Sequence, residues 1–192
     1  IIAFRNKTAL AVTPNHRMVV RVRNDNYESL NIKRADELTI WDKLVTSPSA
    51  GWHGRDTLGL SFDCDDEDLA EMLGWWIAEG SMRRLTENSP FQRDVIISQV
   101  KPDGVKALRE LLDKTPWRWN RRGSDFITTN KELYEFLLPY SGAQNKRVPP
   151  CVRDASPRLI EAFLRGYIAG DGWWQNDGMR CSATISKGLA DD

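Results

Sequence analysis

The stretch "FLRGYIAGDG" (163–172) decides the fold, because a near-copy, "MLGWWIAEG" (72–80), precedes it by about ninety residues. Each copy is an apolar run, rich in small residues, that ends on an acid followed by a glycine. The acid is Asp171 in the later copy and Glu79 in the earlier one. The sequence therefore predicts an internal repeat in which each copy contributes one helix.

The residues around the two copies predict amphipathic helices over 66–79 and 157–170. Ser156 is a suitable N-cap for the second helix, and acids fill the first turn of the first helix, where the helix dipole favours them. The apolar positions recur at helical spacing: Leu69, Met72, Leu73 and Trp76 in the first helix, and Leu159, Ile160, Phe163, Leu164 and Tyr167 in the second.

Small residues four positions apart suggest that the two helices pack closely against each other. The pairs are Gly74 with Ala78 and Gly166 with Gly170. Two residues at this spacing share one helix face and let a second backbone approach. We therefore expect all four at the contact between the two helices.

Such packing would bring the carboxylates of Glu79 and Asp171 together at the negative ends of both helices, where each charge is disfavoured. A hard divalent cation with oxygen ligands, such as Mg²⁺, would relieve the repulsion, and carboxylate-bound metals stabilise phosphodiester cleavage. The alternative is that each acid is only a solvated helix end before Gly80 or Gly172.

The remaining pattern predicts an α+β protein with two domains. Residues 1–62 read as short strands, such as "ALAVT" and "RMVVRVR" around the turn "TPNH", and 63–192 alternate helices with strands. The order αββαββα covers a first repeat of about 66–143, and a second repeat starts near 156 and is incomplete. Its expected parts are helices at 66–79, 102–113 and 130–138 and strands at 82–86, 94–100, 117–121 and 125–129.

Composition excludes several classes of protein. The 192 residues are 41% hydrophobic and 28% charged, and no run approaches the ~18 apolar residues of a membrane span. Three distant cysteines without a C-x-x-C pair argue against a disulfide framework or a zinc site, which fits an intracellular, cytoplasmic location. The start "IIAFRNK" and the end "SKGLADD" lead us to expect an internal piece of a longer protein.

Net charge is zero, from 27 basic and 27 acidic residues, but the charges are segregated. Residues 63–79 hold seven acids and no Lys or Arg, whereas 82–122 hold ten Lys or Arg against five acids. Overall neutrality argues against nucleic acid as a partner, but the basic segment favours it.

The paired motifs "MLGWWIAEG" and "LRGYIAGDG" resemble the two LAGLIDADG (DOD-type) motifs of homing endonucleases. The resemblance covers about 66–192. It implies two helices paired at a pseudo-two-fold axis within one monomer, strands that straddle double-stranded DNA, and metal binding and catalysis by Glu79 and Asp171 with Mg²⁺. Glu79 departs from the family, which has Asp at this position.

A lysine in "NKRVPP" (145–150) also fits this family. Intein-borne members carry a Lys before an apolar-Pro pair upstream of the second motif, and Lys146 occupies that place. The resemblance implies a catalytic Lys146 near the scissile phosphate, where a cation stabilises developing charge. The alternative is one solvated Lys in a linker.

"TPNHRMVV" (13–20) resembles a block of the Hedgehog/intein (Hint) splicing fold. The resemblance implies that 1–62 are part of a Hint domain, that His16 polarises a scissile peptide bond, and that Thr13 supports it by hydrogen bonding. Its partners would be the flanking segments of a host protein, the exteins. The alternative is a turn with an exposed His. His53 reads as a loop residue.

Basic residues of the expected strands are candidate DNA contacts. In "WRWNRR" (117–122) strand alternation would place Trp117 and Trp119 on one face and Arg118 and Asn120 on the other. A solvated basic face over an aromatic core is the alternative. The candidates for phosphate and base-edge contacts are Arg83, Arg84, Arg93, Arg118, Asn120, Arg121 and Arg122.

Together these features predict an intein-encoded endodeoxyribonuclease. It would make metal-dependent double-strand breaks at a long DNA site, within an element that splices itself out of its host protein. Two alternatives remain: a non-catalytic nucleic-acid-binding module, such as a degenerate endonuclease or RNA maturase, and an element that only splices. Neither the host protein nor the DNA target follows from the sequence.

Overall fold

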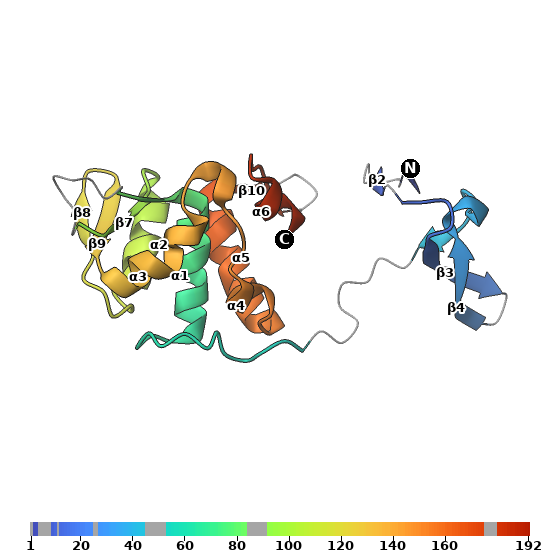
Figure 1. Cartoon of the computed structure of the whole chain (residues 1–192), viewed down its shortest axis with the longest axis horizontal. Helices are drawn as coiled ribbons and strands as arrows, with labels where there is room; N and C mark the ends of the chain where they lie inside the picture. Colours follow the sequence, from blue (N-terminus) through green and yellow to red (C-terminus); the bar gives the residue numbers. More distant parts are fainter. Residues whose placement is uncertain are drawn as a thin grey trace. The chain divides into compact units, whose positions relative to one another are not determined.

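A computed structural model describes residues 2–3, 9–10, 12–24, 27–44, 53–83, 92–174 and 180–192. The chain divides into two compact units, Ile1–Gly51 and Trp52–Asp192 (Figure 1). The protein is of the mixed α+β class, as the sequence predicted. No helix in the described ranges is long and apolar enough to cross a membrane.

The N-terminal unit is built from strands. An antiparallel hairpin joins β3 (Arg17–Asn24) to β4 (Tyr27–Arg34), and β5 (Lys43–Leu44) pairs with the other edge of β3. A separate ladder joins β1 (Ile2–Ala3) to β2 (Ala9–Leu10), and a 3₁₀ turn, η1, spans Ala35–Glu37. The described part of this unit is β-rich, in agreement with the alternating pattern.

The second unit begins with α1 (Asp66–Glu79) and runs through β6 (Gly80–Met82), β7 (Asp94–Ser98), α2 (Pro102–Leu112), β8 (Asn120–Arg122), β9 (Asp125–Thr129) and α3 (Lys131–Leu137). This is the expected αββαββα order. The strands form one antiparallel sheet, β6-β7-β9-β8, and the helices pack on one of its faces (Figure 1).

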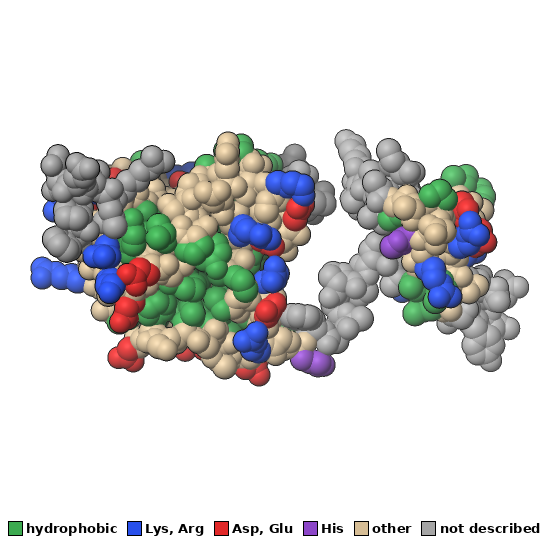
Figure 2. Space-filling view, in the orientation of Figure 1, with side chains coloured by type: hydrophobic (Ala, Val, Ile, Leu, Met, Phe, Trp, Pro, Cys, Tyr) green, Lys and Arg blue, Asp and Glu red, His purple; other side chains and the backbone are tan. Residues whose placement is uncertain are grey.

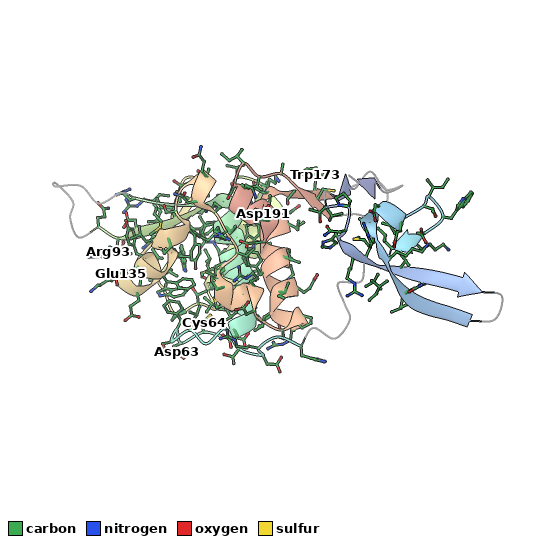
Figure 3. The ribbon with its side chains drawn as sticks, turned by 45° about the vertical axis from the view of Figure 1, so that its right-hand side comes forward. Asp63, Cys64, Arg93, Glu135, Trp173 and Asp191 are labelled. Carbon is green, nitrogen blue, oxygen red and sulfur yellow. The ribbon has the colours of Figure 1, made fainter. Side chains whose placement is uncertain are left out.

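The chain continues through two 3₁₀ turns, η2 (Leu138–Tyr140) and η3 (Ala143–Asn145), and the short helix α4 (Pro150–Arg153). It then repeats the opening with α5 (Pro157–Asp171), followed by β10 (Gly172–Trp174), β11 (Arg180–Ser182) and α6 (Lys187–Asp191). β10 and β11 pair antiparallel. In Figure 3, Trp173 marks β10 and Asp191 marks α6.

The core of the second unit lies between α1, the sheet and the other helices. Trp75, Trp76, Phe126 and Phe163 are among its largest fully buried side chains. On the face that carries α3 and α4, a hydrophobic area is bordered by charged side chains (Figure 2). Leu138 and Leu164 are among the exposed apolar residues of this unit.

The predicted boundary at 62/63 differs from the division at Gly51/Trp52. The segment before α1, marked by Asp63 and Cys64 in Figure 3, belongs to the second unit. Leu58 in this segment is buried in the core, and Arg55 forms a β-bridge with Ala155. The polar composition of the segment hid these two attachments.

The predicted strand at 117–121 is also wrong in its first half, since β8 begins only at Asn120. Trp117 packs edge-on against Phe62 at 5.1 Å between ring centroids, and Trp119 Nε1 donates to Thr115 Oγ1 at 2.9 Å. These contacts hold the two indoles in a bend that precedes the strand. The expected strand at 82–86 begins earlier, at Gly80, directly after α1.

Candidate functional site

The two repeat helices, α1 and α5, pack against each other along their length, as predicted. A Cβ added to Gly74 would lie 2.0 Å from the Phe163 carbonyl oxygen, and one added to Gly166 would lie 2.1 Å from that of Glu71. No real side chain tolerates such distances, so the two backbones are in direct contact. The small residues are required by this contact.

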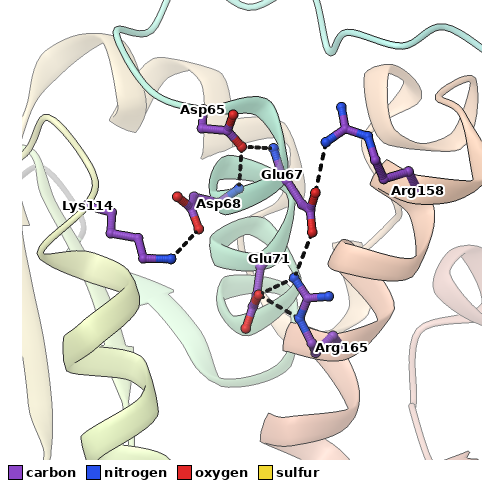
Figure 4. Close-up of polar contacts among 7 residues, drawn as sticks. All are labelled: Asp65, Glu67, Asp68, Glu71, Lys114, Arg158 and Arg165. Carbon is purple, nitrogen blue, oxygen red and sulfur yellow. Dashed lines mark hydrogen bonds and ion pairs between the residues drawn. The ribbon is translucent and has the colours of Figure 1, made fainter.

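Ion pairs join α1 to its neighbours near the start of the helix (Figure 4). Arg165 Nη2 lies 2.6 Å from Glu71 Oε2, and Arg158 Nη1 lies 2.8 Å from Glu67 Oε2. Lys114, in the turn after α2, pairs with Asp68 at 2.9 Å. Three acids of the run, Glu67, Asp68 and Glu71, therefore pair with bases from other parts of the unit, although each exposed pair contributes only about 0–1 kcal/mol.

The other end of the helix pair carries the two acids of the motifs. Glu79 is the last residue of α1, and Asp171 is the last residue of α5. A Cβ added to Gly170 would lie 2.5 Å from Ala78 Cβ and 3.1 Å from Glu79 Cγ. Close packing at Gly170 therefore brings the Glu79 side chain to the residue that precedes Asp171.

Electrostatics at this end are unfavourable for negative charge. Partial burial and the neighbouring Asp171 carboxylate raise the pKa of Glu79 above its ordinary value. Partial burial also raises the pKa of Asp171, while Lys146 and Lys101 oppose that rise. The carbonyls of two helix C-termini add to the negative potential.

Lys146 lies at the same end of α1 and is only 7% exposed. Its Nζ donates to the carbonyl oxygens of Trp76 at 2.7 Å and Gly80 at 2.9 Å, and it stands 3.8 Å from the centroid of the Trp76 ring. Burial lowers the pKa of Lys146 to about 8, against the opposing effect of Asp171 and Glu79. It is not the solvated linker residue of the alternative reading.

A cavity of about 790 Å³ opens beside these residues. Lys146 and Asp171 form part of its wall, together with Ser81 and Arg83 of the sheet side and Thr184 from beyond β11. The cavity therefore connects the helix ends with one edge of the sheet.

The residues present suit a hard cation with few protein ligands. The described side chains include no group of three or more His, Cys, Asp or Glu that could hold a metal ion. Glu79 and Asp171 are a pair of oxygen donors with raised pKa values, and a divalent cation would offset their charge. Mg²⁺ retains several waters and binds with one or two carboxylates, which fits this donor set.

The sheet face opposite the helices carries three of the predicted DNA contacts. Strand pairing places Asn120 beside Ile127 and Arg122 beside Asp125, on the face opposite the buried Phe126. Arg83 extends β6 and donates its backbone N–H to Asp94 on the same face. All three side chains are exposed.

The remaining predicted contacts do not share that face. Arg121 pairs with Phe126 in the ladder and its guanidinium lies 5.7 Å from the Phe126 ring centroid, so alternation places it on the helix-covered side. Arg118 is exposed in the bend before β8, and Arg93 is half-buried before β7. Arg84 lies outside the described residues.

Thr13 and His16 form a turn in the N-terminal unit. The backbone N–H of His16 donates to the Thr13 carbonyl oxygen at 3.0 Å, and both residues are exposed. His53 is exposed and lies in neither a helix nor a strand, as predicted.

Sequence reasoning missed two residues of the site. Lys101, just before α2, opposes the rise in the pKa of both carboxylates, and only the fold brings it near them. Asp94, at the start of β7, is 4% exposed although it lies on the outer sheet face. Its position before a β-branched run was the available signal.

No family model matches the chain. The proteolytic component of an ATP-dependent Clp protease from Chlamydomonas moewusii is 28% identical over 187 residues, which is 84% of this chain and 18% of that protein. A DNA polymerase from Thermococcus aggregans is 29% identical over 112 residues, which is 56% of this chain and 6% of that protein. A component of the A-type ATP synthase from Pyrococcus abyssi is 24% identical over 196 residues, which is 92% of this chain and 19% of that protein. The chain thus spans less than a fifth of each of these relatives.

Proposed function

We propose that the chain is part of an intein that carries a LAGLIDADG homing endonuclease, and that the second unit binds and cleaves double-stranded DNA with Mg²⁺. The observation that carries the proposal is the helix pair. Two copies of one motif pack backbone against backbone and end in Glu79 and Asp171 at the same end of the pair.

The relatives support an inserted element. By their names they are a protease, a DNA polymerase and an ATP synthase, which are unrelated classes, and each shares only a minor part of its length with this chain. A segment common to such different proteins does not account for any one of their named activities. A mobile element inserted into different hosts accounts for the pattern.

The chemistry assigned to the site follows from its charges. Glu79 and Asp171 would hold Mg²⁺, which supplies Lewis-acid stabilisation for in-line phosphodiester cleavage. Lys101 and Lys146 reduce the negative potential around the two carboxylates. This reduction favours the ionised form of both acids, which is the form that binds a cation.

The sheet supplies the DNA-binding surface in this proposal. Arg83, Asn120 and Arg122 present donors on the face that no described helix covers, where phosphates and base edges would lie. Arg118 is exposed and precedes Asn120 by two residues, so it is also available for a phosphate contact. These cations bind the DNA backbone in proportion to their number, so affinity falls steeply with salt.

In the N-terminal unit, Thr13 and His16 are assigned to the splicing reaction. Their shared turn and exposure leave both side chains accessible to a peptide bond of the host junction. The flanking reading frame tests this assignment, because splicing needs a Cys or Ser at the start of the element, a His-Asn pair at its end, and recognisable host segments on both sides.

A second candidate is a nucleic-acid-binding module without nuclease activity. It is favoured by Lys146, whose ammonium donates to two main-chain carbonyls and so stabilises the end of α1. That bonding commits two of its three donors to the protein.

The deciding experiment measures binding and cleavage separately. Duplexes are selected from a random library by binding, in EDTA, to a purified version of the protein whose second repeat is completed at the C-terminus, and are then incubated with Mg²⁺. Double-strand cleavage is the expected result. Tight binding without cleavage at any Mg²⁺ or Mn²⁺ concentration would support the second candidate, and no duplex binding at low salt would exclude both.

A further inference from the structure

Asp94 is buried on the face of the sheet that carries polar residues. It is the first residue of β7, and strand alternation places its side chain on the face of the sheet opposite that of the core residue Val95. An ionised carboxylate is seldom buried unless hydrogen-bonded donors surround it. Its 4% exposure therefore requires partners on the sheet surface itself.

Three side chains supply those partners. Thr129 Oγ1 donates to Asp94 Oδ1 at 2.6 Å, Gln92 Nε2 donates to Oδ2 at 2.9 Å, and Arg83 Nη1 lies 3.2 Å from Oδ2. Because an ionised carboxylate only accepts, it selects the NH₂ end of the Gln92 amide. Asp94 thus fixes one end of Gln92 and one nitrogen of Arg83.

A small depression adjoins this cluster. Its volume is about 100 Å³, and its wall includes Gln92, Asp94, Asn120 and Arg122. Small-molecule sites are usually about 300–1,000 Å³, so the depression is too small for a metabolite. It has room for one edge of a larger, flat group placed over the sheet.

We propose that Asp94 is a positioning residue that makes Arg83 read one guanine in the DNA. The inference rests on the proposed DNA binding by this sheet face. A guanidinium has five donors in a planar fork, and the ion pair with Asp94 engages Nη1. The rest of the fork, on a side chain that is 43% exposed, would donate to the O6 and N7 acceptors of guanine.

A fixed orientation allows an arginine to distinguish one DNA base from another. An Arg that moves freely over the surface binds phosphates, and phosphate contacts carry no sequence information. An Arg held by a buried carboxylate presents its donors in one geometry. Asp94 therefore acts on specificity without touching the base.

The test compares base preferences among variants of the full chain, by selection from a random duplex library followed by sequencing of the bound pool. Wild type should prefer guanine at one position by about tenfold or more. Asp94→Asn should lose that preference, and Arg83→Lys should lose it at the same position, because Lys lacks the bidentate fork. Other positions should keep their preferences.

Asp125→Asn is the matched control. Asp125 lies on the same sheet face and accepts from the hydroxyls of Ser98 and Ser124, so the variant removes an equal charge without affecting Arg83. It should retain the guanine preference. Arg83→Lys changes an exposed side chain and should fold normally. If Asp94→Asn does not fold, the base preference of Arg83→Lys still tests the role of Arg83.

Two negative outcomes are distinct. In the first, the wild-type chain binds duplexes, but Asp94→Asn and Arg83→Lys keep its base preferences or lose them at different positions. This result would overturn the inference about Asp94 and leave the proposed function standing. Failure of the wild-type chain to bind any duplex would overturn the proposed DNA binding and this inference with it.

Discussion

At the scale of single residues, Asp171 and Glu79 are charges in an unfavourable place. Each ends a helix, where the main-chain carbonyls already produce negative potential, and burial raises the pKa of both. Such sites are retained where a function needs the charge. The variants below separate that function from folding.

In a version of the protein completed at its C-terminus, Asp171→Asn should abolish Mg²⁺-dependent cleavage and leave DNA affinity unchanged, because a metal ligand is lost while the basic strands keep their phosphate contacts. Glu79→Asp should cleave as well as wild type or better, since it introduces the acid that is usual in the LAGLIDADG motif, which this stretch resembles. Cleavage of the selected duplexes and gel-shift affinity are the measurements. Glu110→Gln, an exposed acid of α2, is the control, and full activity of Asp171→Asn would place the metal site elsewhere.

The two acids also predict a pH dependence of stability. The pKa values of both acids are raised in the folded state, so ionisation of these acids destabilises the fold. This destabilisation is fully present when both acids are ionised, and it disappears as the pH falls through their folded-state pKa values and the acids become protonated. Glu79→Gln/Asp171→Asn should therefore be more stable than wild type at pH 7 without Mg²⁺. Urea unfolding should show this difference shrinking toward about pH 4, and Mg²⁺ should raise the Tm of wild type only.

Lys146 should have the opposite effect on stability at alkaline pH, where stability should rise with pH. Its pKa of about 8 is below its ordinary value of 10.5, so the folded state disfavours the ammonium, and stability should rise with pH between these values. Relative to Lys146→Met, wild type should gain stability across that window. At pH 7 the variant should still lose about 1–3 kcal/mol, because carbonyls lose a donor.

Urea titrations from pH 7 to 11 check the Lys146 prediction. Lys106→Met, at an exposed position of α2, is the control and should show no such window. A stability difference between Lys146→Met and wild type that is constant over the whole range would show that Lys146 does not titrate there.

At the scale of elements, the helix pair depends on the absence of Cβ atoms. Gly166→Ala should lower the free energy of unfolding by about 2–3 kcal/mol, because the added methyl would meet the Glu71 carbonyl and force the helices apart. Thermal and urea unfolding measure the loss. Ala169→Ser adds one atom on the exposed side of the same helix and should change stability by about 0.5 kcal/mol or less.

If Gly166→Ala were as stable as wild type, the two backbones would not be in contact in solution. The readout on function is separate. A variant that folds with the helices further apart should bind DNA through its sheet and cleave it poorly, because the spacing of Glu79 and Asp171 has changed.

Helices were more predictable than strands for a physical reason. The period of apolar residues and the small-residue spacing gave the range of α1 as observed and that of α5 to within one residue. The faces of the arginines in the strands were less predictable, because alternation assigns a face only once the start of the strand and its register are known. Whether Arg121 faces the core or the solvent depends on its register against Phe126, and Trp117 is held out of its strand by Phe62 from a distant segment.

The same limit applies to the site. The closeness of Glu79 and Asp171 followed from residue spacing, since two helices with glycine at their contact must bring their ends together. The approach of Lys101 depends on where α2 begins relative to α1, which no local pattern encodes. The burial of Asp94 needed three partners, from β9, from the residue after β6 and from the residues before β7.

At the scale of the whole molecule, the two units differ in how many of the described buried hydrophobic residues they contain. The core cluster consists of residues from Leu58 onward, all in the second unit. Among the described side chains of residues 12–21 and 30–44, Val20 is the buried hydrophobic one. Among the described side chains, the buried core therefore lies almost entirely in the second unit.

Residues 52–192 expressed alone should unfold cooperatively, at the Tm of the main transition of the full chain. They should also bind the selected duplexes with the same affinity, because the sheet and the helix pair are intact. Calorimetry and gel shifts are the measurements. Residues 1–51 alone should show little protection from amide hydrogen exchange, and a large drop in the Tm of 52–192 would show that the units stabilise each other.

The direct contact between the backbones of α1 and α5 has a consequence for how such a protein changes over generations. Main-chain atoms at Gly74 and Gly166 set the distance between the helices, and the outer sheet face contributes nothing to that contact. Mutations that exchange one exposed strand residue for another therefore leave the spacing of the two acids as it was. Under the proposed function, a lineage would acquire a new recognition sequence, one substitution at a time, without a change in the spacing of Glu79 and Asp171.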